Sequence, residues 1–371
     1  MKINITPKLR LKKLMTLCLF AVFIGCGKQD DLQTIHKITT VVPYQDVKWG
    51  DLRKIESQLD SSLIKTLTFN ESTIWPDKFK LFAGSILRRA KNPGLGVRGL
   101  HHQGISGKGV SVAIIDQNIC LDHPEFSKKI KEYKDVGCNQ PSNTSSYHGP
   151  AVASLLVGDS IGTAPDATLY FVAAPFWNKD AKYMADALNW ILDKNLTLPA
   201  AEKIRAVSVS AAPSGPGSLF TKNNALWDSA FARAVREDVL IIDCSVDKGI
   251  TYPAYFDIDD PENVYKCTSG FPGISSSIKQ NRICVPNSVR TFAEQYDEGK
   301  YSYCYSGRGG ISWAEPYLVG ILALGWQINP GISGTDMVKL IFNSAYVTDE
   351  GARFINPGKY IESVQAFVPG D

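Results

Sequence analysis

Several classes of protein are disfavoured by what the sequence lacks. None of its eight cysteines forms a CxxC pair, and the five histidines are not clustered with them, which argues against a metal site. No apolar run is long enough to cross a membrane as a helix. No basic patch lies beyond the first 13 residues, so nothing indicates a nucleic-acid partner. What remains is a chain of 371 residues, 44% hydrophobic, which can bury a large core.

The N-terminus has the pattern of a targeting segment. Its first 13 residues contain five basic side chains and no acid: Lys2, Lys8, Arg10, Lys12 and Lys13. The apolar run Leu14–Ile24 follows and ends in Phe-Ile-Gly-Cys, which resembles a bacterial lipobox although Phe23 replaces the usual leucine. We therefore predict a lipoprotein signal peptide over residues 1–25 and lipid on Cys26. The protein would be exported and membrane-anchored, facing outside the cytoplasm. The alternative is an ordinary secretory signal with an incidental cysteine.

Processing would change both the charge and the cysteine count. Removing the five basic residues takes the formal charge from +3 to −2. Loss of Cys18 and lipidation of Cys26 would leave an even number of cysteines, which is compatible with disulfides in an exported chain. Six cysteines allow fifteen pairings, and the sequence does not choose among them. They are Cys120, Cys138, Cys244, Cys267, Cys284 and Cys304.

The rest of the chain divides by its pattern. We predict a polar tether over residues 26–45 and a mixed segment over 46–95, either a packed extension or a propeptide, with Arg88-Arg89 as a conceivable cleavage point. From residue 96 apolar strands alternate with helical stretches, which predicts an α/β fold. Its sheet would be doubly wound and mostly parallel, with helices on both faces. The expected strands are 110–116, 167–172, 204–210 and 239–245; the expected helices are 148–157, 180–194 and 224–237.

Three segments carry candidate chemistry. Asp116 ends an apolar strand, His148 opens a helix before Gly-Pro, and Ser312 lies in Gly-Ile-Ser-Trp-Ala-Glu-Pro over residues 310–316. These segments strongly resemble the subtilisin-like serine proteases, the subtilase family, whose triad has the chain order Asp, His, Ser. Two further stretches also match, Gly-Thr-Ala-Pro-Asp-Ala over 162–167 and Asp-His-Pro-Glu-Phe over 122–126. The resemblance covers roughly residues 96–360 and implies a subtilisin-like catalytic domain over 96–371.

The resemblance implies roles for these residues. Ser312 would be the nucleophile, His148 the general base and acid, and Asp116 the group that orients the imidazole. Asp122 is a weaker rival for the orienting role because it lies beyond the strand, and His123 is interpreted as a structural loop residue. Structural calcium is common in the family, but no calcium loop can be mapped here, and no cofactor is required.

The sequence departs from the family pattern at positions near the substrate. Asp247 occupies the place of the asparagine that donates to the oxyanion, and an ionised carboxylate cannot donate. Loss of such a donor costs about 3–4 kcal/mol of transition-state stabilisation. Ser210, Ala211 and Ala212 match the strand that pairs with an extended peptide. Glycine is common where Ala212 stands, so a narrowed pocket with a preference for small or medium side chains is expected. Pro150 replaces the usual threonine and suits a first helical turn.

The main hypothesis is a serine endopeptidase that hydrolyses peptide bonds through an acyl-enzyme. Its partners would be a peptide or protein substrate and, through the N-terminal lipid, a membrane. One alternative is a pseudoprotease that binds peptides with an incomplete oxyanion hole. Another is a specialised peptide-processing or transpeptidating enzyme that uses the same triad.

Overall fold

The computed structural model describes residues 33–140, 144–274 and 281–368. The predicted signal peptide and Cys26 lie outside these ranges. None of the helices within them is both long and apolar enough to span a bilayer. The six remaining cysteines are free thiols, so the structure gives no support to the expected disulfides. Four of them are buried, and burial raises the pKa of the Cys284 thiol to about 12.

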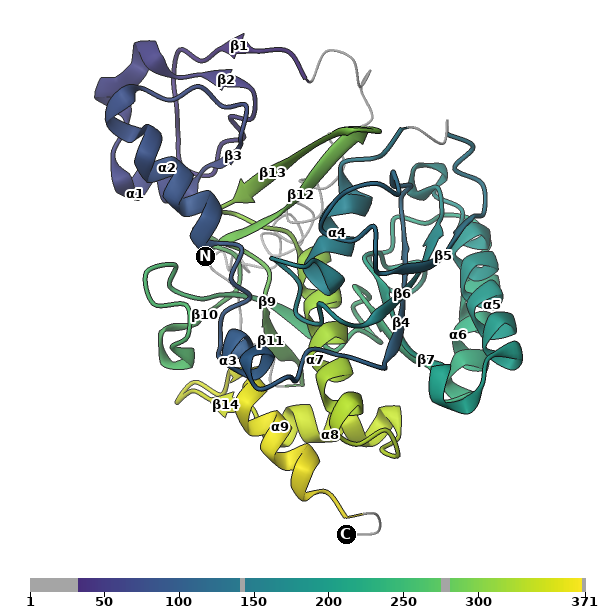
Figure 1. Ribbon diagram of the computed structural model, residues 1–371. Coiled ribbons are helices and arrows are strands. Elements are labelled where there is room, and N and C mark those ends of the chain that lie inside the picture. Colours follow the sequence, from purple (N-terminus) through teal and green to yellow (C-terminus); the bar gives the residue numbers. More distant parts are fainter. Residues whose placement is uncertain (1–32, 141–143, 275–280, 369–371) are drawn as a thin grey trace, which may run out of the picture.

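A five-stranded parallel sheet organises the larger part of the chain (Figure 1). Its strand order is β5-β6-β4-β7-β8, with β4 in the centre. The strands are β4 (Ser111–Asp116), β5 (Ile130–Asp135), β6 (Thr168–Ala173), β7 (Ile204–Val209) and β8 (Leu240–Asp243). Every residue of β4 is buried, as expected for an apolar strand with both faces covered. The predicted α/β class with a parallel sheet is confirmed.

Helices cover both faces of this sheet. Alternate residues of β4 belong to two separate cores, Val112 and Ile114 to one and Ala113 and Ile115 to the other. The first core contains α4 (His148–Val157), α7 (Ala314–Ile328) and α9 (Pro357–Ala366). The second contains α5 (Ala181–Thr197) and α6 (Asn224–Arg236). The two layers place α4 and α7 on the same side of the sheet.

Smaller elements complete the C-terminal half. A second sheet has the order β10-β9-β11-β15-β14. Its strands are β9 (Thr251–Tyr255), β10 (Thr268–Ser269), β11 (Ile283–Pro286), β14 (Tyr346–Val347) and β15 (Arg353–Phe354). Two helical elements of this half are α8 (Gly334–Asn343) and the short 3-10 turn η7 (Ile311–Trp313), whereas α3 (Val97–His102) precedes β4 in the chain. Three more 3-10 turns are η4 (Phe176–Asn178), η5 (Ala200–Glu202) and η6 (Val264–Lys266).

Residues 36–90 form a unit that we call the N-terminal module. It contains β1 (His36–Lys37), β2 (Gly50–Asp51), η3 (Arg53–Gln58), α1 (Ser61–Thr66), β3 (Thr68–Asn70) and α2 (Asp77–Arg89). β1 lies inside the predicted tether and pairs with β2. β3 pairs with β13 (Lys300–Ser306), which pairs in turn with β12 (Arg290–Asp297). Figure 1 shows the module in purple against the β12–β13 hairpin.

Candidate active site

Ser312 lies in the turn η7, directly before the buried helix α7. The glycines before it have a steric reason. Gly309 has φ of +68°, and a Cβ added there would lie 1.9 Å from the carbonyl oxygen of Asn287. Only glycine fits this close approach, which Gly310 continues by donating its N–H to the same carbonyl at 3.3 Å. Pro316 falls in the first turn of α7, where no intrahelical partner for an N–H is lost.

His148 and Asp116 lie where their local sequence predicts. Asp116 is the last residue of β4 and is fully buried, and His148 is the first residue of α4. The two side chains are joined by a 2.7 Å contact between His148 Nδ1 and Asp116 Oδ1. Asp116 Oδ1 also accepts the backbone N–H of Gln117 at 2.7 Å. This arrangement assigns Nδ1 to the carboxylate and leaves Nε2 as the nitrogen for proton transfer.

Trp313 connects the serine turn to the histidine helix. Its ring stacks on the imidazole of His148, with the ring centroids 5.2 Å apart and the planes 30° from parallel. Ser312 itself is buried, and no hydrogen bond between its Oγ and His148 occurs among the described residues. Catalytic hydrogen bonds are often long in structures without substrate and tighten when substrate binds. The sequence motif located Ser312, but nothing in it indicated the stacking role of Trp313.

The predicted peptide-binding segment lies beside the serine. Ser210 Oγ donates to the carbonyl oxygen of Ser312 at 3.0 Å. Ala211 accepts the N–H of Cys244 at 3.0 Å, which ties this segment to the end of β8. Ala212 is half-buried. The structure thus brings the candidate substrate segment and the candidate nucleophile into direct contact.

Asp247 follows β8 in an exposed loop. Its Oδ1 accepts the N–H of Lys248 at 3.1 Å. The carboxylate also packs against Gly215, where an added Cβ would lie 2.5 Å from Asp247 Oδ1. Gly215 comes three residues after Ala212, so Asp247 faces the loop that leaves the peptide-binding segment. Its carboxyl group therefore accepts a hydrogen bond in this position.

Other acidic and basic candidates have different partners. Asp122 accepts from Gln295 Nε2 at 2.7 Å and from the N–H of Gly299. It is therefore held by the β12–β13 hairpin and does not act as a rival orienter. His123 is fully buried, and its ring stacks on Phe126 at 5.1 Å. No group of three potential metal-ligating side chains occurs within the described residues.

A buried acid beside the serine escaped the sequence analysis. Glu315 lies one helical turn after Ser312, is completely buried, and accepts a hydrogen bond from Thr251 Oγ1 at 2.7 Å. Its Oε2 has no hydrogen-bond partner in the described part of the chain. Burial raises the pKa of Glu315 to about 8, although the bond from Thr251 acts in the opposite direction. The available signal was a single acid at the start of an otherwise apolar helix.

Comparison with known protein families gives a match in the region that contains Asp116 and His148. Residues 107–266 match the model of the Subtilase family. The chain is 24% identical over 277 residues to the subtilisin-like protease PopC of Myxococcus xanthus, covering 67% of this chain and 58% of PopC. It is 31% identical over 170 residues to the minor extracellular protease Vpr of Bacillus subtilis, covering 42% of this chain and 19% of Vpr. These matches support a subtilase.

Solved structures agree on the fold. A chain of the subtilase cytotoxin SubAB aligns with a TM-score of 0.56 and 16% identity, covering 74% of this chain and 95% of the toxin chain. Fervidolysin from Fervidobacterium pennivorans aligns with a TM-score of 0.53 and 15% identity, covering 72% of this chain and 45% of fervidolysin. The chain spans less than two thirds of PopC and of Vpr.

Proposed function

We propose that the protein is a serine endopeptidase that uses Ser312, His148 and Asp116 as a catalytic triad. The observation that carries this proposal is the bond of 2.7 Å between His148 Nδ1 and the fully buried Asp116, at a histidine stacked on the residue next to Ser312. A buried carboxylate on Nδ1 fixes the imidazole tautomer and stabilises the imidazolium formed during catalysis. Ser312 also directly precedes α7, so it lies near the positive end of that helix dipole.

The reaction follows from these positions. His148 Nε2 accepts the Ser312 hydroxyl proton while Oγ forms a bond to the peptide carbonyl carbon, which gives a tetrahedral oxyanion. The imidazolium then gives that proton to the leaving amine as the C–N bond breaks, and an acyl-enzyme remains. Water, deprotonated by His148, then attacks the acyl carbon. The bond between that carbon and Ser312 Oγ breaks, His148 returns the proton to Oγ, and the carboxylic acid leaves. Substrate would be held as an extended strand along Ser210, Ala211 and Ala212.

Asp247 supports one alternative, a peptide-binding protein with little or no catalysis. The backbone N–H of Ser312 is one oxyanion donor, whereas an ionised Asp247 accepts hydrogen bonds and repels the developing negative charge. Such a protein would bind peptides without becoming acylated. The same geometry would also serve transpeptidation if an amine replaced water in the second step.

The cellular location is a separate proposal. The lipobox-like run that ends at Cys26 supports an exported lipoprotein held at a membrane. Mass spectrometry of the protein from cells tests it: a diacylglyceryl-modified Cys26 at the new N-terminus is expected. An unmodified chain cleaved elsewhere would contradict it.

A fluorophosphonate probe tests the catalytic proposal. The purified chain and its Ser312→Ala variant are treated in parallel and weighed intact by mass spectrometry. We expect one adduct on the parent and none on the variant, because only an activated serine attacks phosphorus at a useful rate. A folded parent protein without an adduct would refute the protease and leave the peptide-binding alternative. With an adduct present, peptide products distinguish hydrolysis from transpeptidation.

A further inference from the structure

We propose that the N-terminal module stays attached in the working enzyme and that its Lys48 is a positioning residue for the start of the His148 helix. This inference rests on the proposed function, because it assigns a role in holding the same catalytic histidine. It concerns a segment that the sequence leaves open as extension or propeptide.

The module is joined to the rest of the chain by a continuous sheet. In β3, Thr68 pairs with Ser306, Phe69 with Tyr305 and Asn70 with Cys304. The hydrogen bonds continue beyond the strand, with Gly307 N–H donating to Leu67 at 3.0 Å. Removal of the module would expose the unpaired edge of β13, which is an unfavourable surface for a soluble protein.

The module also shares its hydrophobic core with the larger part of the protein. Ile258, Val289 and Tyr305 belong to the same contiguous buried cluster as thirteen apolar side chains of the module. Tyr305 is completely buried, and its hydroxyl donates to the carbonyl oxygen of Lys65 at 2.7 Å. This packing is typical of a permanent part of a fold.

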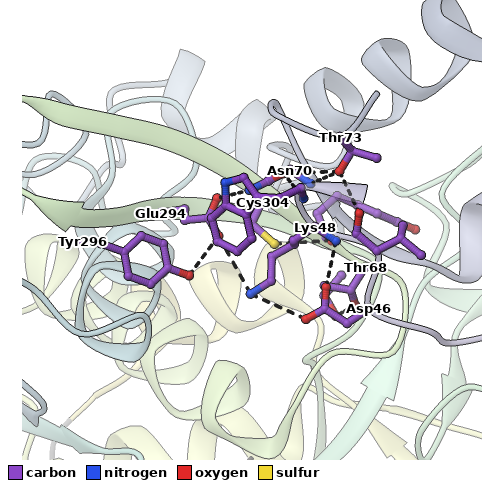
Figure 2. A network of polar contacts seen from close by, with 12 residues as sticks. Asp46, Lys48, Thr68, Asn70, Thr73, Glu294, Tyr296 and Cys304 are labelled. Atoms are coloured by element: carbon purple, nitrogen blue, oxygen red, sulfur yellow. Dashed lines mark hydrogen bonds and ion pairs between the residues drawn. The ribbon is translucent and has the colours of Figure 1, made fainter. Parts of the chain in front are cut away.

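A buried polar network crosses the same boundary. Figure 2 shows the side chain of Lys48 between two carboxylates, Asp46 of the module and Glu294 of β12. The Lys48 ammonium lies 3.9 Å from Glu294 Oε1, and the two side chains are 12% and 1% exposed. Asn70 Nδ2 donates to Glu294 Oε2 at 2.8 Å. Without the module Glu294 would lose Lys48 and Asn70 and keep only the hydrogen bond from Tyr296. A buried carboxylate that has lost its ion-pair partner is strongly destabilising.

Burial and neighbouring groups shift the pKa values of both Lys48 and Glu294. Burial disfavours the ammonium of Lys48, but Cys304, Asp46 and Glu294 together outweigh this effect and hold the pKa of Lys48 above its ordinary value. Burial raises the pKa of Glu294, while Lys48 and the hydrogen bond from Asn70 oppose that rise. Tyr296 also donates to Glu294, at 3.2 Å. The Lys48 ammonium and the Glu294 carboxylate therefore stabilise each other only when the module is in place.

Lys48 reaches the catalytic helix through an aromatic ring. Its ammonium lies 4.0 Å from the ring centroid of Tyr147, the residue immediately before His148. Tyr147 packs edge-on against Trp313, with the centroids 6.4 Å apart, and Trp313 stacks on the imidazole of His148. Lys48, Tyr147 and Trp313 therefore form a packed series of contacts that ends on the general base. Loss of Lys48 would remove one of the groups that pack against the Tyr147 ring.

The attachment of the module is tested by labelling the full chain. After reaction with the fluorophosphonate probe, intact mass and peptide mapping identify the species that carries the adduct. We expect the labelled species to retain the N-terminal module. An adduct found only on chains that have lost residues before 96 would overturn this inference while leaving the proposed protease intact. A complete absence of adduct would overturn the protease and this inference together.

The role of Lys48 is tested with a matched set of variants. Lys48→Met removes the charge, Lys48→Arg keeps it, and Lys80→Met removes an exposed charge on α2 of the same module. For Lys48→Met we expect the acylation rate to fall roughly ten- to hundredfold, as for small displacements of catalytic groups, with a changed pH profile. Lys48→Arg should recover most of the rate, and Lys80→Met should match the parent.

Stability is separated from positioning by a second variant. If Lys48→Met does not fold, Lys48→Met with Glu294→Gln removes the ammonium and the carboxylate together, so that no unpaired charge remains. A folded Lys48→Met or double variant that melts at a lower temperature but is acylated at the parental rate, with the parental pH profile, would refute the positioning role. It would leave Lys48 as a purely structural residue.

Discussion

Glu315 should make the stability of the protein fall as the pH rises. The unfolded carboxyl ionises near its ordinary value of 4.5, whereas burial holds the pKa of the folded group at about 8. Between these values the folded state keeps a proton that the unfolded state has lost. The stabilisation from this group is therefore complete below pH 4.5 and is lost as the pH rises towards 8.

The size of the effect follows from the same two pKa values. Each pH unit between them changes the free energy of unfolding by about 1.4 kcal/mol, which gives about 5 kcal/mol over the whole interval. This is comparable with the total stability of many domains. Glu315→Gln cannot ionise, and its amide oxygen can still accept the hydrogen bond from Thr251. The variant should therefore lose this pH dependence.

Urea unfolding at several pH values measures the difference. Both proteins are compared in a Ser312→Ala background, so that self-digestion does not interfere. We expect the advantage of Glu315→Gln over the parent to grow between pH 4.5 and 8 and then to level off. Glu350→Gln, at an exposed position, serves as a control and should give no such trend. A constant difference between Glu315→Gln and the parent would refute the reasoning, because it would mean that Glu315 ionises normally in the folded state.

Three further predictions concern the catalytic steps and the serine turn. Asp247→Asn should raise kcat because it restores a donor of the kind worth about 10²–10³-fold, and a rate no higher than that of Asp247→Ala would contradict this. Asp116→Asn should lower the acylation rate by about 10⁴-fold while the fold survives, as measured with the fluorophosphonate probe and circular dichroism. Gly309→Ala should destabilise the protein by more than about 2 kcal/mol and abolish acylation, since it combines positive φ with a backbone clash. Gly299→Ala is its control in thermal unfolding, because it shares the positive φ but has open space around its Cβ.

Local sequence patterns predicted the parts of the fold that depend on short-range information. The central strand ending at Asp116 and the helix opening at His148 follow from apolar runs and from residue types at their ends. The strand expected over 239–245 ends earlier, at Asp243, because the next residue turns to bond Ala211. The short strands of the second sheet were missed, since two to five residues carry too little periodicity to identify.

The contacts around the candidate site depend on residues far apart in sequence. Glu315 could be noticed as an acid in an apolar helix, but its partner Thr251 lies 64 positions earlier. Lys48 has no local feature that distinguishes it from an exposed lysine. Its contacts with Glu294 and Tyr147 exist only because β3 pairs with β13. Sequence patterns therefore located the candidate triad positions, whereas the residues that contact them could be identified only from the three-dimensional structure.

The pairing of β3 with β13 has a consequence for biosynthesis. Thr68 and Ser306 are 238 positions apart, so the ribosome completes the second strand long after the first. At roughly 5–20 residues per second, the delay is about 10 to 50 seconds. During that time β3 cannot pair with β13, because β13 has not yet been synthesised. Ser312 is synthesised shortly after the last residue of β13. The β3–β13 pairing and the proposed nucleophile are therefore completed at nearly the same time, and a chain interrupted before residue 306 has neither.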